Sequence, residues 1–217
     1  MTDTATKAAK LLLEAGCVTV NVKEPFRYTS GVLSPIYCDN RLLISDLNRR
    51  RTIIGLWGDM LKSKNIPFDL IAGTAMAGIP HASWLSDLLD KPMIYIRNEQ
   101  KGHGKRNKIE GRLEKGATVL VVDDLITTGG SSLAAVEAIR EAGGKVAHVT
   151  SIFSYQLRTA LDNFTQANCT LHPLSTFQTL ITLATESKHL KKDEATFALE
   201  WAFDPQSWGE KFNQKSG

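Results

Sequence analysis

Two adjacent aspartates, Asp123 and Asp124, lie between an apolar run and a turn rich in hydroxyls and glycines, in the segment 119–131 that reads VLVVDDLITTGGS. An unbroken apolar run predicts a strand buried on both faces of a parallel sheet, so the two carboxylates are expected to emerge at its carboxyl end. Open α/β sheets bind their ligands at that edge. The acid pair is therefore the first candidate for chemistry.

The turn after the acid pair offers the groups that an anion needs. It runs from Thr127 to Ser131 and places hydroxyls and unobstructed backbone N–H groups just before a predicted helix, whose dipole favours negative charge. Because carboxylates accept hydrogen bonds from a ribose diol, acids followed by such a turn indicate a phosphorylated sugar with its hydroxyls over the aspartates. The alternative is a strand that ends in a solvated Asp-Asp turn.

This segment resembles the motif that binds 5-phosphoribosyl 1-diphosphate (PRPP) in type I phosphoribosyltransferases, which consists of an apolar run, two acids and a Thr/Gly-rich turn. The resemblance implies that the acid pair contacts the ribose hydroxyls, directly or with magnesium, and that the turn wraps the 5-phosphate. The implied PRPP-binding residues of the segment are Asp123, Asp124, Leu125, Ile126, Thr127, Thr128, Gly129, Gly130 and Ser131.

A second turn between a predicted strand and a predicted helix lies at 71–82, IAGTAMAGIPHA. In phosphoribosyltransferases the corresponding turn brings its backbone to the diphosphate, and the match here covers Gly73 to Gly78. Taken alone, the segment would indicate an ordinary turn that uses glycine for positive φ. We expect His81, on the helix that follows, to be a packed helix residue rather than a catalyst.

Residues 97–112, RNEQKGHGKRNKIEGR, contain hardly any apolar side chain and several bases. Loops longer than about 12 to 15 residues are uncommon in compact domains unless they are lids, binding loops or linkers. Departure of diphosphate from an anomeric carbon builds negative charge, which cations folded over the site can stabilise while they exclude water. Arg97, Lys101 and His103 are the expected donors, and the candidate catalytic residues are Lys101, His103, Asp123 and Asp124. A solvated basic loop is the alternative.

Two segments resemble orotate phosphoribosyltransferases in particular. They are the K-G-H-G sequence of this loop and the stretch 26–41, FRYTSGVLSPIYCDNR, with the YCDNR sequence of a bacterial form. The resemblance extends over nearly the whole chain and implies transfer of the phosphoribosyl group from PRPP to orotate in pyrimidine (UMP) biosynthesis, giving orotidine 5′-monophosphate and diphosphate. It also implies Mg²⁺ held mainly through PRPP, and a homodimer in which each lid carries Arg97, Lys101 and His103 to the neighbouring subunit's site.

The chain departs from some relatives at four positions that carry a cation there. It has uncharged residues instead: Thr29, Ala77, Asn98 and Tyr155. Burying the orotate carboxylate without a cation or several hydrogen bonds would be costly. We therefore hypothesise that Arg41, or backbone N–H groups near Tyr37 and Cys38, bind this carboxylate. Thr127 matches the threonine or serine that contacts orotate in the family.

Composition fits one α/β enzyme domain of 217 residues, with 42% hydrophobic and 23% charged residues. The net charge of +3 suits anionic small molecules but falls short of the basic stripe of a nucleic-acid binder. Three dispersed cysteines indicate neither a disulfide framework nor a zinc site and favour a reducing cytoplasm. No run of about 18 apolar residues or signal-peptide core is present, so neither membrane spanning nor secretion is expected.

Strands that alternate with helices predict a mostly parallel sheet with helices on both faces, in line with the type I phosphoribosyltransferase fold that the resemblance implies. We expect strands at 69–72, 93–96, 119–122 and 146–153, and helices at 5–15, 45–64, 78–89, 131–142, 156–167 and 176–185. Ser45 is the expected N-cap of its helix. The domain covers 1–217, with an N-terminal hood at about 1–45, a core at about 46–175 and a C-terminal helical extension at about 176–217, whose aromatic residues are expected to pack against the sheet.

Two other functions fit parts of this pattern. One is a phosphoribosyltransferase that uses a purine or uracil. The other is a PRPP-sensing regulator that binds nucleic acid without chemistry. Such regulators usually need a DNA-binding module or a concentrated basic face, and the sequence contains no helix-turn-helix segment.

Overall fold

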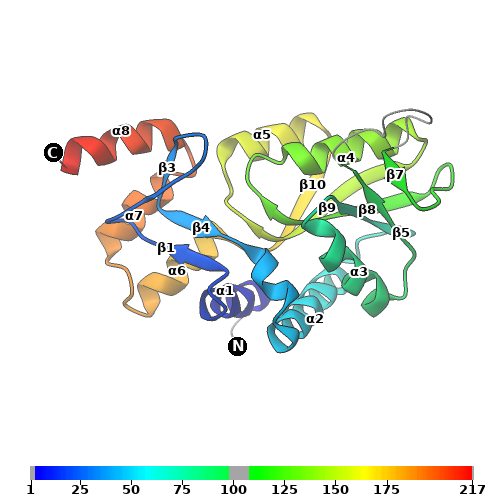
Figure 1. Ribbon diagram of the computed structural model, residues 1–217, viewed down its shortest axis with the longest axis horizontal. Coiled ribbons are helices and arrows are strands. Elements are labelled where there is room, and N and C mark those ends of the chain that lie inside the picture. The colour runs from blue at the N-terminus through cyan, green and yellow to red at the C-terminus, as the bar shows by residue number, and fades with distance from the viewer. Residues whose placement is uncertain (1–2, 98–107, 217) are drawn as a thin grey trace.

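The computed structural model describes residues 3–97 and 108–216. At its centre is a six-stranded sheet with the order β10-β9-β8-β5-β6-β7 (Figure 1). The strands are β5 (Leu70–Thr74), β6 (Met93–Ile96), β7 (Ile109–Glu110), β8 (Thr118–Ile126), β9 (Lys145–Ser154) and β10 (Thr170–Thr176). All neighbouring pairs are parallel except β6 and β7, which are antiparallel. The expected mostly parallel sheet is confirmed.

The direction in which the chain winds across this sheet reverses between two neighbouring strands. From β5 the chain passes through helix α3 (Gly78–Leu89) to β6 on one side, whereas β8 is followed by β9 and β10 on the other. Such a switch point opens a crevice at the carboxyl ends of the two strands. The two turns singled out in the sequence, after β5 and after β8, lie on either side of that crevice.

Helices cover both faces of the sheet, as expected. In Figure 1, α4 (Gly130–Glu141) and α5 (Arg158–Gln166) lie above it, and α1 (Thr4–Glu14), α2 (Leu47–Ser63) and α3 lie below. The central strand β8 is therefore enclosed, and both Val121 and Val122 are 0% exposed although their side chains point to opposite faces. This burial fixes the carboxyl end of β8 in place.

The N-terminal hood consists of short elements. They are β1 (Val18–Val20), β2 (Phe26–Arg27), β3 (Leu33–Ser34), β4 (Ile36–Cys38) and the 3₁₀-helix η1 (Asn40–Ile44). β1 pairs with β4, and β2 pairs with β3, both antiparallel. The C-terminal helices α6 (Phe177–Glu186), α7 (Lys192–Glu200) and α8 (Pro205–Ser216) complete the chain, and Figure 1 shows α7 and α8 beside the hood strands.

The C-terminal aromatic residues pack mainly against this hood and against one another, which corrects the expectation that the sheet receives them. Trp201 Nε1 donates a hydrogen bond to the carbonyl oxygen of Leu33 at 2.9 Å. Trp208 stacks on Phe197 and Phe212. Indole rings need a partner for their N–H when buried; Trp201 finds it on the hood, and Trp208 donates to the carbonyl oxygen of Phe197 at 2.7 Å.

Several elements differ from the expectations, including β7, which lies inside the expected loop 97–112. Three of the differences have a clear physical reason. Ser45 is not the N-cap of α2, because it ends η1 with helical backbone angles; Asp46, whose backbone is extended, caps α2 by accepting from Arg49 N–H. β8 continues through the acid pair to Ile126 because β9 pairs with it that far. β10 was not predicted, since Pro173 weakens its strand signal; it lies at the edge of the sheet, where proline is tolerated.

Within the described ranges, no helix is both long enough and apolar enough to cross a membrane.

Candidate active site

The two acids at the end of β8 have different surroundings. Asp123 is 5% exposed, and its carboxylate accepts three hydrogen bonds. One oxygen accepts from the backbone N–H of Asp124 at 2.9 Å, and the other accepts from the hydroxyls of Ser131 at 3.1 Å and Ser132 at 2.6 Å. Asp123 therefore joins the end of the strand to the first turn of α4.

Asp124 is less deeply buried, and its charge is poorly compensated. Burial, followed by the negative charge of Asp123, raises the pKa of Asp124 to about 7. A carboxylate in this situation gains most when hydroxyl donors or a cation approach it. Of the two acids, Asp124 has more hydrogen-bonding capacity left for a ligand.

The turn after β8 has the geometry of an anion site. Gly129 is the N-cap of α4, has a φ of 81°, and leaves the first backbone N–H groups of the helix without a side-chain cap. The side chains of Thr127, Thr128 and Ser131 are exposed. Asn163 on α5 donates to the carbonyl oxygen of Thr128 at 3.0 Å and so holds the turn from behind.

The turn after β5 lies directly against the acid strand. Its peptide bond between Ala75 and Met76 is cis. Thr74 Oγ1 donates to the carbonyl oxygen of Val122 at 3.3 Å. A Cβ on Gly78 would collide with Thr74 Oγ1 and lie 2.7 Å from that same carbonyl oxygen. Glycine is therefore required here by close approach of two backbones rather than by a positive φ.

His81, on the helix that follows this turn, is a packed residue, as expected. It is 0% exposed and lies 5.5 Å from Trp84, ring centre to ring centre. Neither ring nitrogen has a hydrogen-bond partner among the described residues. Burial and then the charge of Arg50 lower the pKa of His81 to about 4, so the ring is neutral at physiological pH.

A cavity of about 220 Å³ lies between the two turns. Among the residues that line it are Thr74, Arg97, Lys108 and Ser131. Arg97, one of the expected lid cations, therefore lines this cavity. It also forms an ion pair with Glu110 at 3.5 Å. The other two, Lys101 and His103, lie outside the described residues, as does Asn98.

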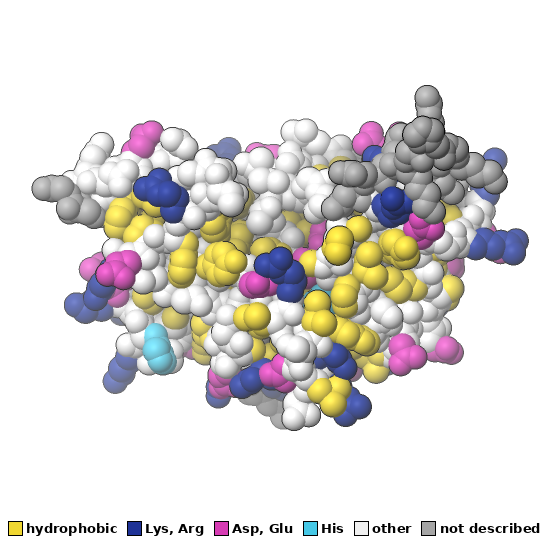
Figure 2. Space-filling view, in the orientation of Figure 1, with side chains coloured by type: hydrophobic (Ala, Val, Ile, Leu, Met, Phe, Trp, Pro, Cys, Tyr) yellow, Lys and Arg dark blue, Asp and Glu magenta, His cyan; other side chains and the backbone are white. Residues whose placement is uncertain are grey.

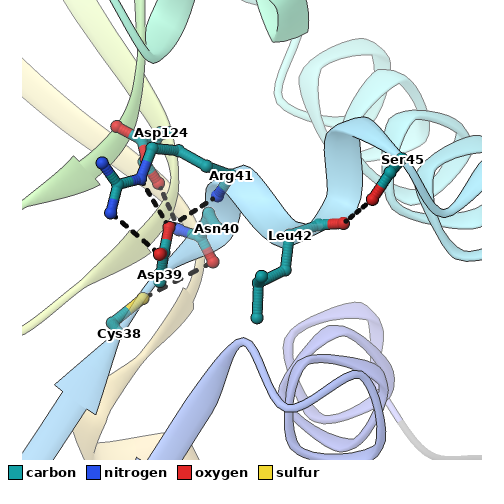
Figure 3. Close-up of polar contacts among 7 residues, drawn as sticks. All are labelled: Cys38, Asp39, Asn40, Arg41, Leu42, Ser45 and Asp124. Carbon is teal, nitrogen blue, oxygen red and sulfur yellow. Dashed lines mark hydrogen bonds and ion pairs between the residues drawn. The ribbon is translucent and has the colours of Figure 1, made fainter.

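The hood reaches the end of β8 through the stretch 37–41. The Asn40 side-chain amide donates to the backbone carbonyl oxygen of Asp124 at 2.8 Å (Figure 3). Arg41 donates from Nε at 2.6 Å and Nη2 at 2.8 Å to the two carboxylate oxygens of Asp39, which holds the pKa of Asp39 below its usual value. Cys38 is buried and Tyr37 is 45% exposed.

The fold thus brings together the acid pair, the glycine turn and the hood stretch, and it adds residues that the sequence reasoning missed. Ser132 holds Asp123, Asn163 holds the turn, and Asn40 joins hood and strand. Only Asn40 had a signal, as part of the YCDNR sequence. Ile126 is 1% exposed, and its carbonyl oxygen accepts from Tyr155 N–H, so its side chain belongs to the core.

Comparison with known proteins shows the family to which the chain belongs. Residues 45–179 match the model of the phosphoribosyl transferase domain family. The chain is 52% identical to an orotate phosphoribosyltransferase of Coxiella burnetii, over 94% of this chain and 98% of that protein. It is 44% identical to an orotate phosphoribosyltransferase of Enterococcus faecalis, over 96% and 100%. The crystal structure of orotate phosphoribosyltransferase from Aeropyrum pernix superposes with a TM-score of 0.71 at 28% identity, covering 84% of this chain and 98% of that one. The chain belongs to the orotate phosphoribosyltransferase family.

Proposed function

We propose that this protein transfers the 5-phosphoribosyl group from PRPP to orotate, giving orotidine 5′-monophosphate and diphosphate. The observation that carries the proposal is the contact between the hood and the end of β8, at the switch point of the sheet. There the Asn40 side-chain amide donates to the backbone carbonyl oxygen of Asp124 at 2.8 Å. The test is the fall in orotate absorbance when PRPP and Mg²⁺ are added. Turnover of adenine or uracil but not orotate would favour another base, and PRPP binding without turnover would favour a regulator.

The roles of the two acids follow from their contacts. Asp124, with free hydrogen-bonding capacity, holds the ribose diol and favours the positive charge that develops on the ribosyl ring. Asp123 positions the turn through its bonds to Ser131 and Ser132. The 5-phosphate accepts hydrogen bonds from the exposed hydroxyls of the turn and from the first N–H groups of α4. The backbone of the turn from Gly73 to Gly78 approaches the diphosphate.

The nitrogen of orotate attacks the anomeric carbon from the face opposite the leaving diphosphate, so the configuration inverts. Negative charge grows on the departing oxygens. Arg97, Lys101 and His103 stabilise that charge, and His103 serves in addition as a proton shuttle. Mg²⁺, bound through PRPP oxygens, supplies neutralisation of the diphosphate charge. The residues fit such an ion, because the uncompensated carboxyl of Asp124 gains from a nearby cation, while no group of three or more His, Cys, Asp or Glu side chains in the described ranges could hold a metal by itself.

The orotate carboxylate has two candidate partners, the Arg41 guanidinium and backbone N–H groups near Tyr37 and Cys38. The fork of Arg41 is occupied by Asp39, but the pair is solvent-accessible, with the Arg41 side chain 63% exposed. Exposed ion pairs contribute only about 0 to 1 kcal/mol, so a substrate carboxylate can replace Asp39 at small cost. We therefore propose that Arg41 binds the orotate carboxylate and that Thr127 contacts the edge of the base.

Replacing Arg41 with lysine should raise the orotate KM about tenfold and leave the PRPP KM unchanged, because lysine keeps the charge but not the bidentate fork. Steady-state kinetics with each substrate varied in turn measures both constants. Arg49→Lys is the matched control, since Arg49 also pairs with a partly exposed aspartate, Asp46, at 2.7 Å. An unchanged orotate KM in Arg41→Lys would contradict this role and would favour the backbone N–H groups near Tyr37 and Cys38 as the partner of the carboxylate.

The pKa of Asp124 predicts a pH dependence of stability. Because this pKa is raised to about 7 in the folded protein, the fold retains a proton that the unfolded chain releases near its ordinary value of 3.8. The free energy of unfolding should therefore fall as the pH rises through this window. Relative to Asp124→Asn, which cannot titrate, the wild type should lose about 1 to 3 kcal/mol between about pH 5 and about pH 8 in urea unfolding. A constant difference between the two proteins would contradict the shift.

We further propose a homodimer in the cytoplasm, with each lid completing the neighbouring site. Large hydrophobic side chains are exposed on η1, α2 and α3, and Figure 2 shows hydrophobic side chains spread over this face of the molecule. Those on these elements are Leu42, Ile44, Leu47 and Leu88. Exposed large hydrophobic side chains of this kind support a subunit contact on this face. The three free, buried cysteines fit a reducing compartment.

A further inference from the structure

The side-chain amide of Asn40 connects two parts of the site that are far apart in the sequence. Asn40 is 0% exposed and is the first residue of η1. Its Nδ2 donates to the backbone carbonyl oxygen of Asp124, 84 positions later in the chain. Its Oδ1 accepts from the Cys38 thiol at 3.5 Å. Figure 3 shows the amide between the hood and the end of β8, with Arg41 and Asp39 beside it.

Burial makes this connection stiff. A hydrogen bond that is withdrawn from water cannot be exchanged for a water contact, and leaving the carbonyl oxygen of Asp124 unpaired would be costly. The Asn40 amide and the Asp124 carbonyl group therefore move together. The exposed Asp39–Arg41 pair next to it does not have this property, because water can replace either partner.

The hydrogen bond of Asn40 lies between the residues proposed to bind the base and the residue proposed to bind the ribose. On the chain, Tyr37, Cys38 and Arg41 are the residues to which the carboxylate of the base has been assigned. Across the bond lies Asp124, to which the ribose diol has been assigned. A displacement of residues 37–41 when the base binds is thus passed through the hydrogen bond of the buried Asn40 side chain to the backbone that carries the sugar-binding carboxyl.

We propose that Asn40 is a positioning residue that couples the base subsite to the PRPP subsite, so that orotate and PRPP strengthen each other's binding. This inference rests on the proposed function. Asn40 touches neither substrate; it acts by holding the Asp124 backbone in register with the hood. Coupling between two sites requires a shared element whose position both ligands bias, and the Asn40–Asp124 bond is that element.

The test is a matrix of initial rates in which PRPP and orotate are varied together, measured for the wild type, Asn40→Ala and Ser175→Ala. Ser175 is the matched control, because it is also 0% exposed and its hydroxyl donates to the backbone carbonyl oxygen of Ala5, 170 positions away and outside the site. Saturating orotate should lower the PRPP KM of the wild type and of Ser175→Ala at least about fivefold. In Asn40→Ala this factor should fall close to one, and kcat/KM should fall about tenfold.

Melting temperatures separate coupling from stability, since Asn40→Ala loses two side-chain hydrogen bonds and Ser175→Ala loses one. If Asn40→Ala does not fold, Asn40→Leu replaces it, because leucine keeps about the same volume and removes the Nδ2 donor. A coupling factor near one in the wild type, or an unchanged factor in the Asn40 variant, would overturn the inference while orotate turnover still stands. Absence of orotate turnover in the wild type would instead overturn the proposed function.

Discussion

Replacing Lys101 with alanine should lower kcat at least about a hundredfold, which is the scale for losing one preorganised charge donor at a developing anion. The leaving diphosphate gains negative charge as its bond to the anomeric carbon breaks, and the lysine stabilises that charge more in the transition state than in the bound substrate. The PRPP KM should change less than kcat, because ground-state binding also draws on the turn after β8. Pre-steady-state and steady-state rates of orotate consumption measure the effect.

Lys105→Ala is the control for this prediction, since it removes the same charge from the same basic segment and should change kcat by less than about threefold. An equal mixture of the Lys101→Ala and Asp124→Ala proteins then tests whether the lysine acts in the site of the neighbouring subunit. If it does, mixed dimers contain one site with both residues, and activity should return to about a quarter of the wild-type value. Near-native turnover by Lys101→Ala would remove the lid mechanism, and a mixture that stays inactive would place the lysine in its own subunit's site.

Replacing Gly129 with alanine should raise the PRPP Kd about ten- to a hundredfold. Gly129 has a φ of 81°, which costs an alanine about 1 to 2 kcal/mol. In addition, the new Cβ would lie 2.6 Å from Cε2 of the Phe164 ring on α5, so the turn or the ring must shift. A displaced turn no longer directs the first N–H groups of α4 at the 5-phosphate. Calorimetric titration with PRPP measures the loss.

Gly116→Ala separates backbone strain from loss of the phosphate site. Gly116 has a similar φ of 86°, but nothing lies within 4 Å of a Cβ placed on it, and it precedes β8 at the opposite end of the strand. It should lower the melting temperature without changing PRPP affinity. Equal PRPP affinities for Gly129→Ala and the wild type would show that the turn is not the phosphate site.

The sequence by itself was sufficient for the elements whose signals are local. The apolar run that ends at Val122 predicted a central buried strand, and the glycine-rich turn before Gly130 predicted a helix start, because periodicity and turn chemistry are properties of neighbouring residues. The acid pair and the turn were identified for the same reason. Edge strand β10 was missed, since Pro173 gives a local signal against a strand that the sheet edge overrides.

Only the tertiary structure distinguished the two acids and joined the hood to them. Asp123 and Asp124 look alike in the sequence, yet Ser131 and Ser132 occupy one carboxylate and leave the other partly uncompensated. The contact between Asn40 and Asp124 spans 84 positions. Hydrogen bonds of this kind form between groups that folding brings together, so no local pattern encodes them.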